Sequence, residues 1–224
     1  MTLILYAIAP VAIVICYIYV KDKYEKEPKR LLVYSFLMGG ILSIIITTIL
    51  YLFFDLFLPL NNKYSVLQQF IRAFFVVGLT EEFSKYLIVR YYAQPKNAFN
   101  ERFDGIVYAV VVSMGFAAVE NIFYVAEGGV PTAVLRAFTA VPAHATFGII
   151  MGYFMGMAKF SKNTVKLNLT GLAIAALFHG AYDFFLFINF IPGMAIGAFV
   201  SLIIGIVLSR KAIQRHQKNS KFKV

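Results

Sequence analysis

The chain has 224 residues, of which 60% are hydrophobic and only 14% charged, and its mean hydropathy is +0.76. So few polar side chains cannot cover a water-soluble globule, so the composition excludes a soluble protein and predicts a multi-span membrane protein. The net charge of +10 does not indicate nucleic-acid binding, because the basic residues are spread over short loops and a terminal tail. These positions favour contact with anionic membrane lipid instead.

Seven apolar runs approach or exceed the roughly 20 residues that a helix needs to cross the hydrocarbon core of a bilayer. They cover residues 3–20, 31–58, 66–89, 105–126, 133–158, 167–188 and 192–209. The runs are uniformly apolar and lack the alternation of membrane β-barrel strands. The predicted fold is therefore an all-α, polytopic transmembrane helical bundle of about seven spans.

Basic residues are sorted unevenly among the connections. Residues 21–30, 90–102, 159–166 and 210–224 hold five, three, three and six of them, whereas the alternate connections hold only Lys63. Because cytoplasmic loops are enriched in Lys and Arg, this pattern predicts an N-terminus outside and a C-terminus in the cytoplasm of a cell membrane. We expect one integral-membrane domain over residues 1–224, with its motifs in residues 66–188 and a basic cytoplasmic tail over residues 210–224.

Two adjacent acids, Glu81 and Glu82, lie inside the third apolar run. Ionisable groups at this depth are costly, so they normally face a polar interior and serve a function. On a helix, Lys85 lies four residues after Glu81 and three after Glu82, close enough to neutralise one of them. The other carboxylate would then be available as a general base. The alternative is a purely structural ion-pair network, which would leave one surplus buried charge.

Other spans carry polar groups at comparable depth. Glu120 and Asn121 lie in the fourth run, where Tyr124 shares a face with Glu120. His144 lies in the fifth run, two residues after Pro142, a residue that can bend a helix. In the sixth run, His179 and Asp183 share a face, and an acid beside an imidazole can fix its tautomer. The helical rise of 1.5 Å per residue nevertheless places these acids and histidines at different depths in the membrane, so the helices would have to tilt to bring them together.

These motifs, taken in order, resemble the PrsW family of bacterial intramembrane proteases, which is related to the CAAX prenyl endopeptidases. The resemblance covers residues 80–183. It rests on Glu81-Glu82-x-x-Lys85, Glu101-x-x-Asp104-Gly105-x-x-Tyr108, Glu120-Asn121-x-x-Tyr124, His144 and His179-x-x-x-Asp183.

The resemblance implies an intramembrane endopeptidase of the glutamic type, without a cofactor, that cuts a single-pass membrane protein such as an anti-sigma factor. It implies that Glu81 activates the hydrolytic water with help from His144, that Glu82 and Lys85 tune this base, and that His179 stabilises the oxyanion. Where the CAAX enzymes often have asparagine this chain has Asp183, and an ionised carboxylate cannot donate a hydrogen bond. Asp183 is therefore expected to orient His179. Glu101 and Asp104, at the start of the fourth run, are either helix caps or supporting site residues.

Three alternatives remain open from the sequence. Two histidines and a glutamate on separate helices could bind zinc, although the His-Glu-x-x-His pattern of many zinc proteases is absent. A proton-coupled transporter or channel could use the same buried acids and histidines, but the spans show no internal two-fold repeat. A non-enzymatic scaffold could use these polar groups only to hold its helices together.

Overall fold

The computed structural model describes residues 2–223, and it confirms the predicted all-α class. Within these residues the chain forms helices joined by short connections, with no strand. The first two long helical segments are α1 (Thr2–Lys21) and the continuous run of α2 (Lys29–Met38), η1 (Gly39–Ser43) and α3 (Ile44–Phe57). The short segments labelled η are π-helical turns, which widen the helix locally.

The remaining segments follow in chain order. A third continuous run consists of α4 (Val66–Ile71), η2 (Arg72–Gly78), α5 (Leu79–Ile88) and η3 (Val89–Ala93). It is followed by α6 (Arg102–Phe138), α7 (Ala140–Lys159), α8 (Thr164–Phe187) and α9 (Ile196–Lys218). Each of the seven predicted apolar runs is therefore largely helical.

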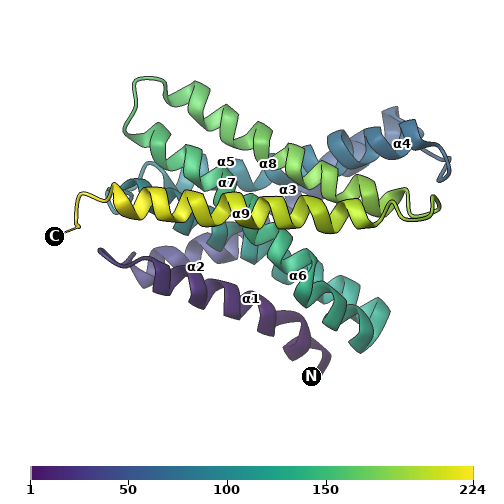
Figure 1. The fold of residues 1–224 in the computed structure, drawn as a ribbon, viewed down its shortest axis with the longest axis horizontal. Coiled ribbons are helices and arrows are strands. Elements are labelled where there is room, and N and C mark those ends of the chain that lie inside the picture. The colour runs from purple at the N-terminus through teal and green to yellow at the C-terminus, as the bar shows by residue number, and fades with distance from the viewer. Residues whose placement is uncertain (1, 224) are drawn as a thin grey trace.

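Helices α6 and α7 form the centre of the bundle. Every side chain over residues 103–118 of α6 is buried, and most of α7 is buried as well. Helices α1 and α2 pack against α6, while α8 and α9 pack against α7. The helices cross obliquely rather than in parallel (Figure 1). Acids and histidines that the helical rise per residue would place at different depths can therefore still meet.

Five helical stretches in the described residues are long and apolar enough to cross a membrane. They are Thr2–Lys21, Lys29–Phe57, Arg102–Lys159, Thr164–Phe187 and Ile196–Lys218. The stretch Arg102–Lys159 joins α6 to α7 and so contains two of the predicted spans. The run over residues 66–93 is too rich in charged residues to meet the same criterion, because it carries the Glu81-Glu82 motif. The number of spans and their orientation stay predictions.

Two boundaries differ from the sequence prediction. The fifth run was expected at 133–158, but α7 begins only at Ala140, because the backbone is non-helical at Thr139 and again at Gly129, where φ is +66°. Residues 130–138 form a short helical segment between these breaks. Pro142 therefore lies in the first turn of α7, where its missing N–H costs no hydrogen bond and no bend is needed. At the other end, α9 continues to Lys218, well into the predicted polar tail.

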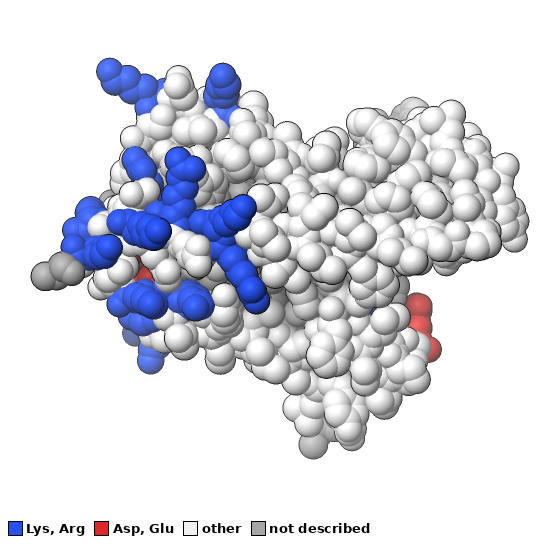
Figure 2. Space-filling model, in the orientation of Figure 1, with Lys and Arg blue, Asp and Glu red and all other residues white. Residues whose placement is uncertain are grey.

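Basic side chains gather at one end of the molecule. Figure 2 shows them around the end at which the C-terminus lies, whereas the opposite end of the visible face is almost free of charge. The connection between α3 and α4 lies at that opposite end (Figure 1). By the positive-inside rule, the end with the gathered basic residues is the predicted cytoplasmic end of the bundle.

Close contact between α6 and α7 depends on small residues at their crossing. A Cβ atom built on Gly152 would lie 2.3 Å from the carbonyl oxygen of Gly105, and one on Gly156 would overlap the backbone at Arg102. Gly148, Gly152 and Gly156 recur every four residues on α7, and each faces α6, so they let the backbones of these two helices approach closely.

We expect Gly152→Val to lower the thermal stability of the purified protein, because the added side chain must push α7 away from α6. Overpacking of a tight interface costs about 1 to 3 kcal/mol or more. The matched control is Ala173→Val, which enlarges a side chain on the exposed face of α8. Equal melting temperatures for both variants in detergent would contradict the proposed packing role.

Candidate active site

The centre of the site is the acidic motif on α5. Glu82 is fully buried, and its Oε1 lies 2.7 Å from the Lys85 ammonium nitrogen. Lys85 also reaches Glu81, at 3.4 Å from Oε2. One lysine thus contacts both acids, and the shorter contact is to Glu82. Because the three residues are three and four positions apart on one helix, the local helical geometry alone brings them together.

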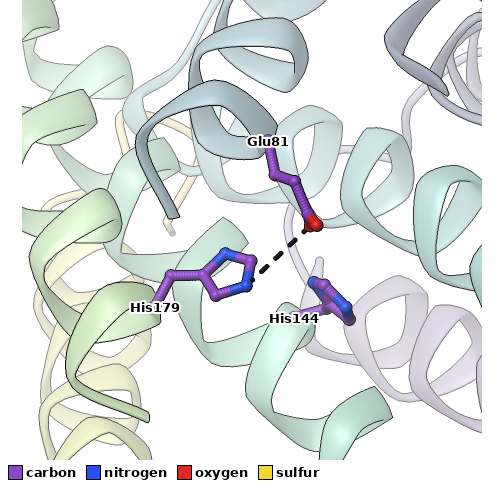
Figure 3. Close-up of side chains that lie close together, drawn as sticks. All are labelled: Glu81, His144 and His179. Carbon is purple, nitrogen blue, oxygen red and sulfur yellow. Dashed lines mark ion pairs between the residues drawn. The ribbon is translucent and has the colours of Figure 1, made fainter. Parts of the chain in front are cut away.

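His144 from α7 and His179 from α8 face Glu81 across the bundle, and all three side chains point toward a common centre (Figure 3). The two imidazole rings are perpendicular, with centroids 5.4 Å apart. His179 Nε2 lies 3.8 Å from Glu81 Oε2. One nitrogen or oxygen atom from each residue can be chosen so that all lie within 4.8 Å of one another. A single water molecule could therefore contact all three.

Each imidazole is bound to an acid through one of its nitrogens. His144 Nε2 lies 2.8 Å from Glu120 Oε2 on α6, and His179 Nδ1 lies 2.9 Å from Glu82 Oε1. The second nitrogen of His179 also contacts Asp183, at 3.3 Å. Carboxylates in such positions fix the orientation and tautomer of an imidazole. The contact between His179 and Asp183 is the one expected from their spacing.

Glu120 is itself held by the short segment between the two backbone breaks. Arg136 Nη2 lies 2.7 Å from Glu120 Oε2, and Arg136 Nε donates to Asn121 Oδ1 at 2.5 Å. Asn121 in turn donates to the backbone carbonyl of Ala7 on α1.

No hydrogen bond joins Glu120 to Tyr124, although the two share a face of α6. The Arg136 guanidinium instead lies over the Tyr124 ring, 4.1 Å from the centroid of that ring. Arg136 was not identified from the sequence.

Aromatic rings surround the charged groups and limit their movement. Phe147 stacks on the His179 ring with centroids 4.8 Å apart. The Lys85 ammonium lies 4.1 Å from the centroid of Phe116. These contacts exclude water from the rear of the site, so each ion pair acts in a medium of low polarity.

A cavity of about 740 Å³ opens onto the site. Glu81, Glu120, His144, His179 and Asp183 line it, whereas Glu82 and Lys85 do not. The rest of the wall includes side chains from η2 and from each of α3, α6, α7 and α8. The motif therefore separates into one glutamate that faces the cavity and one that faces the protein interior.

Tyr51 on α3, like Arg136, is a site residue that the sequence analysis missed. Its hydroxyl donates to Glu81 Oε1 at 2.7 Å and its side chain lines the cavity. Tyr51 lies in an apolar run whose only charged residue is Asp55, and nothing in this spacing points to Glu81 on another helix. Only the packing of α3 against α5 shows the contact.

Glu101 and Asp104 lie elsewhere, at the start of α6, and do not line the cavity. Asp104 Oδ2 accepts from the backbone N–H of Glu101 at 2.7 Å, and the two form a capping box. Glu101 also accepts from the Ser220 hydroxyl, and the Tyr108 hydroxyl donates to Glu27. Burial, reinforced by the nearby Asp104 charge, raises the pKa of Glu27 to about 9. These acids join the helix start to its neighbouring loops, which favours the capping interpretation over a direct role in the site.

Comparison with known proteins identifies the chain's family. A family model described as PrsW family intramembrane metalloprotease matches residues 27–210. The chain belongs to the PrsW family. Proteins named Protease PrsW are 40% identical in Oceanobacillus iheyensis and 38% in Bacillus subtilis, over 80% of both chains in each case. A third, from Geobacillus kaustophilus, is 36% identical over 89% of this chain and 86% of its own. No solved structure matches.

PrsW-family membership makes this chain a membrane protease, and the relatives named above are bacterial. The same membership favours the protease over the transporter and scaffold alternatives. The polar groups described above are thus the place in this PrsW-family chain where peptide hydrolysis is to be sought.

We expect Tyr51→Phe to lower kcat for cleavage by about tenfold or more with little change in KM. The reason is that the Tyr51 hydroxyl donates a hydrogen bond to the Glu81 carboxylate and does not bind a distant part of the substrate. The matched control is Tyr124→Phe, which removes a hydroxyl from the same cavity without a contact to Glu81. Equal kcat values for the two variants would show that the Tyr51 hydroxyl has no part in the reaction.

Proposed function

We propose that this protein is an intramembrane endopeptidase in which Glu81, assisted by His144 and His179, activates a water molecule to hydrolyse a peptide bond. The observation that supports it is the convergence of one carboxylate and two imidazoles on a single cavity within the helical bundle. Amide hydrolysis needs a base for the attacking water and a hydrogen-bond donor for the developing oxyanion. This arrangement supplies both.

The environments of the two glutamates support Glu81 as the base. Glu82 is bound by Lys85 at 2.7 Å and by His179 at 2.9 Å, and it does not face the cavity. Glu81 faces the cavity and is farther from the lysine. In the proposed reaction, the water oxygen attacks the carbonyl carbon while its proton passes to Glu81, which then delivers that proton to the leaving amine nitrogen.

The remaining residues position these groups. Glu120 holds His144, while Glu82 and Asp183 hold His179, so that each imidazole keeps one fixed orientation. Two donors can turn to the oxyanion during the reaction. The Tyr51 hydroxyl is released from Glu81 once that carboxylate takes up the proton of water, and the His179 Nε2–H is held only by the longer 3.3 Å contact to Asp183. Asp183 acts through His179, since an ionised carboxylate offers no donor of its own.

We further propose that the substrate is a membrane-anchored protein with a single span, and an anti-sigma factor is the kind of substrate that the resemblance implies. The cavity lies within a helical bundle and is lined by apolar as well as polar side chains, among them Phe123, Leu135 and Leu186. A segment that leaves the membrane next to such a wall can reach the site without unfolding a soluble domain.

A zinc-dependent form is the second candidate. The donor set of Glu81, His144 and His179 fits a divalent metal, and each histidine has a carboxylate on another nitrogen, as metal-bound histidines usually do. A bound zinc ion would polarise the substrate carbonyl and make its water a stronger nucleophile. Against it, the Lys85 ammonium lies 3.3 Å from His144 Nδ1 and 3.4 Å from Glu81, close to the same donor atoms.

We expect Glu81→Gln to lower the cleavage rate of a single-pass substrate by about a hundredfold to ten-thousandfold, because the amide cannot accept the proton of water. The assay uses the purified full-length chain reconstituted with a panel of single-pass membrane proteins. Glu127→Gln, which changes an exposed acid of α6, is the matched control and should keep the wild-type rate. Wild-type cleavage by Glu81→Gln would refute the proposed role.

The metal question has its own test. In the metal-free mechanism, cleavage continues after treatment with a strong chelator, and elemental analysis of the active protein finds no stoichiometric metal. Loss of activity with the chelator, recovery with zinc, and loss of bound zinc in His179→Ala would instead establish the zinc-dependent form.

A further inference from the structure

A second cavity, of about 460 Å³, adjoins the one at the site. Its wall is built from α3, from the connection to α4 and from η2. Thr48, Tyr51, Arg72 and Val77 line both cavities, so the two spaces meet at these residues. The second cavity lies toward the end of the bundle opposite the basic residues, where the connection after α3 runs (Figures 1 and 2).

Arg72 stands at the junction of the two cavities without an acidic partner. Within residues 2–223 no carboxylate lies within ion-pairing distance of it, and its guanidinium lies 5.9 Å from the centroid of the Phe187 ring. Arg136, the other arginine of the first cavity, is instead paired with Glu120. A guanidinium inside an apolar helical run normally has a partner or faces water.

The second cavity holds other polar groups that are also free to bind. Lys63, Asp55 and Asn61 line it and are exposed. Lys63 and Arg72 carry two positive charges against the one negative charge of Asp55. The space therefore favours an anionic group, while the Asn61 and Asp55 oxygens can accept hydrogen bonds from a peptide backbone.

The distance from Arg72 to Glu81 sets how far from the scissile bond an anionic group of a substrate would have to lie in order to reach Arg72. Nine residues of helix separate Arg72 from Glu81, which corresponds to about 13 Å along the axis. An extended peptide covers this distance in about four residues. A peptide whose scissile bond lies at Glu81 and which continues into the second cavity would thus present its fourth residue to Arg72.

We propose that the second cavity is a substrate subsite in which Arg72, supported by Lys63, binds the carboxylate of an Asp or Glu about four residues from the scissile bond. The inference rests on the proposed function, because it assigns a specificity to that same site. The acidic residue lies on the side of the scissile bond that faces away from the basic end of the bundle. Arg72 is a specificity residue and takes no part in the chemical step.

A lipid phosphate is the competing partner for an exposed arginine near a helix end. The lining pattern favours the peptide, because Arg72 shares its cavity with Tyr51, whose hydroxyl contacts Glu81. An arginine that only bound a lipid phosphate would not need to line the cavity that contains Glu81.

The test uses single-pass peptides with one common span, in which each of six positions beyond the scissile bond is in turn Asp or Asn. Cleavage by the full-length chain in proteoliposomes of neutral lipid is followed by mass spectrometry. We expect Asp at about the fourth position to raise kcat/KM roughly tenfold over Asn, mainly through KM, since a hydrogen-bonded charge pair has about this value. The preference disappears in Arg72→Gln and is retained in Arg210→Gln, which removes an exposed charge from α9.

A binding measurement separates failure of this inference from failure of the proposed function. With Glu81→Gln, the Asp peptide should bind about tenfold more tightly than the Asn peptide, and Arg72→Gln added to this background should remove the difference. Absence of all cleavage by the wild type would overturn the protease proposal while the binding ratio still tests the subsite. Equal binding and cleavage of Asp and Asn peptides would overturn the subsite. So would an effect of Arg72→Gln that is the same for every peptide and depends on anionic lipid, because Arg72 would then be a lipid anchor.

Discussion

The contact between Lys85 and Glu82 is the interaction on which the site depends. Both side chains are almost completely buried, and a carboxylate in such a place is tolerated only when it is paired and hydrogen-bonded. Glu82 meets this need by binding Lys85 from its own helix and His179 from α8. The same bonds therefore neutralise the acid and fix α5 against α8. Removing one partner would leave the other as an uncompensated buried charge, which typically costs about 3 to 5 kcal/mol.

Close packing of the central helices also gives the second histidine, His144, an acidic partner. His144 can reach Glu120 only because α6 and α7 approach closely along their glycine contacts. Glu120 then depends on Arg136, which follows the break at Gly129 and so faces back toward the part of α6 that carries Glu120. The short segment between Gly129 and Thr139, most of which was predicted as the beginning of the fifth run, thus supplies the cation that balances Glu120.

Much of this architecture could be predicted from the sequence, because membrane helices are specified by composition alone. The acids and histidines that meet in the cavity could be found for a related reason, since a charged group in an apolar run stands out without any knowledge of the fold. Tyr51 and Arg136 could not be assigned in this way. A tyrosine is ordinary in an apolar run. Gly128, Gly129 and Pro131 do predict a break before Arg136, but they do not show that the chain folds back to bring this arginine to Glu120. The helix start at Ala140 was missed because residues 133–138 are as apolar as those that follow.

Cleavage at such a site also places a demand on the substrate. The carbonyl of a peptide bond within a membrane helix is hydrogen-bonded and shielded, so the bond must be held in an extended conformation before water can attack it. Unwinding a helix in hydrocarbon leaves N–H and C=O groups without partners, each at a cost of several kcal/mol. The polar residues of the two joined cavities, from His144 at one end to Asn61 at the other, supply replacement partners along one continuous path. The wall that recognises the substrate is then the same wall that stabilises its unwound form.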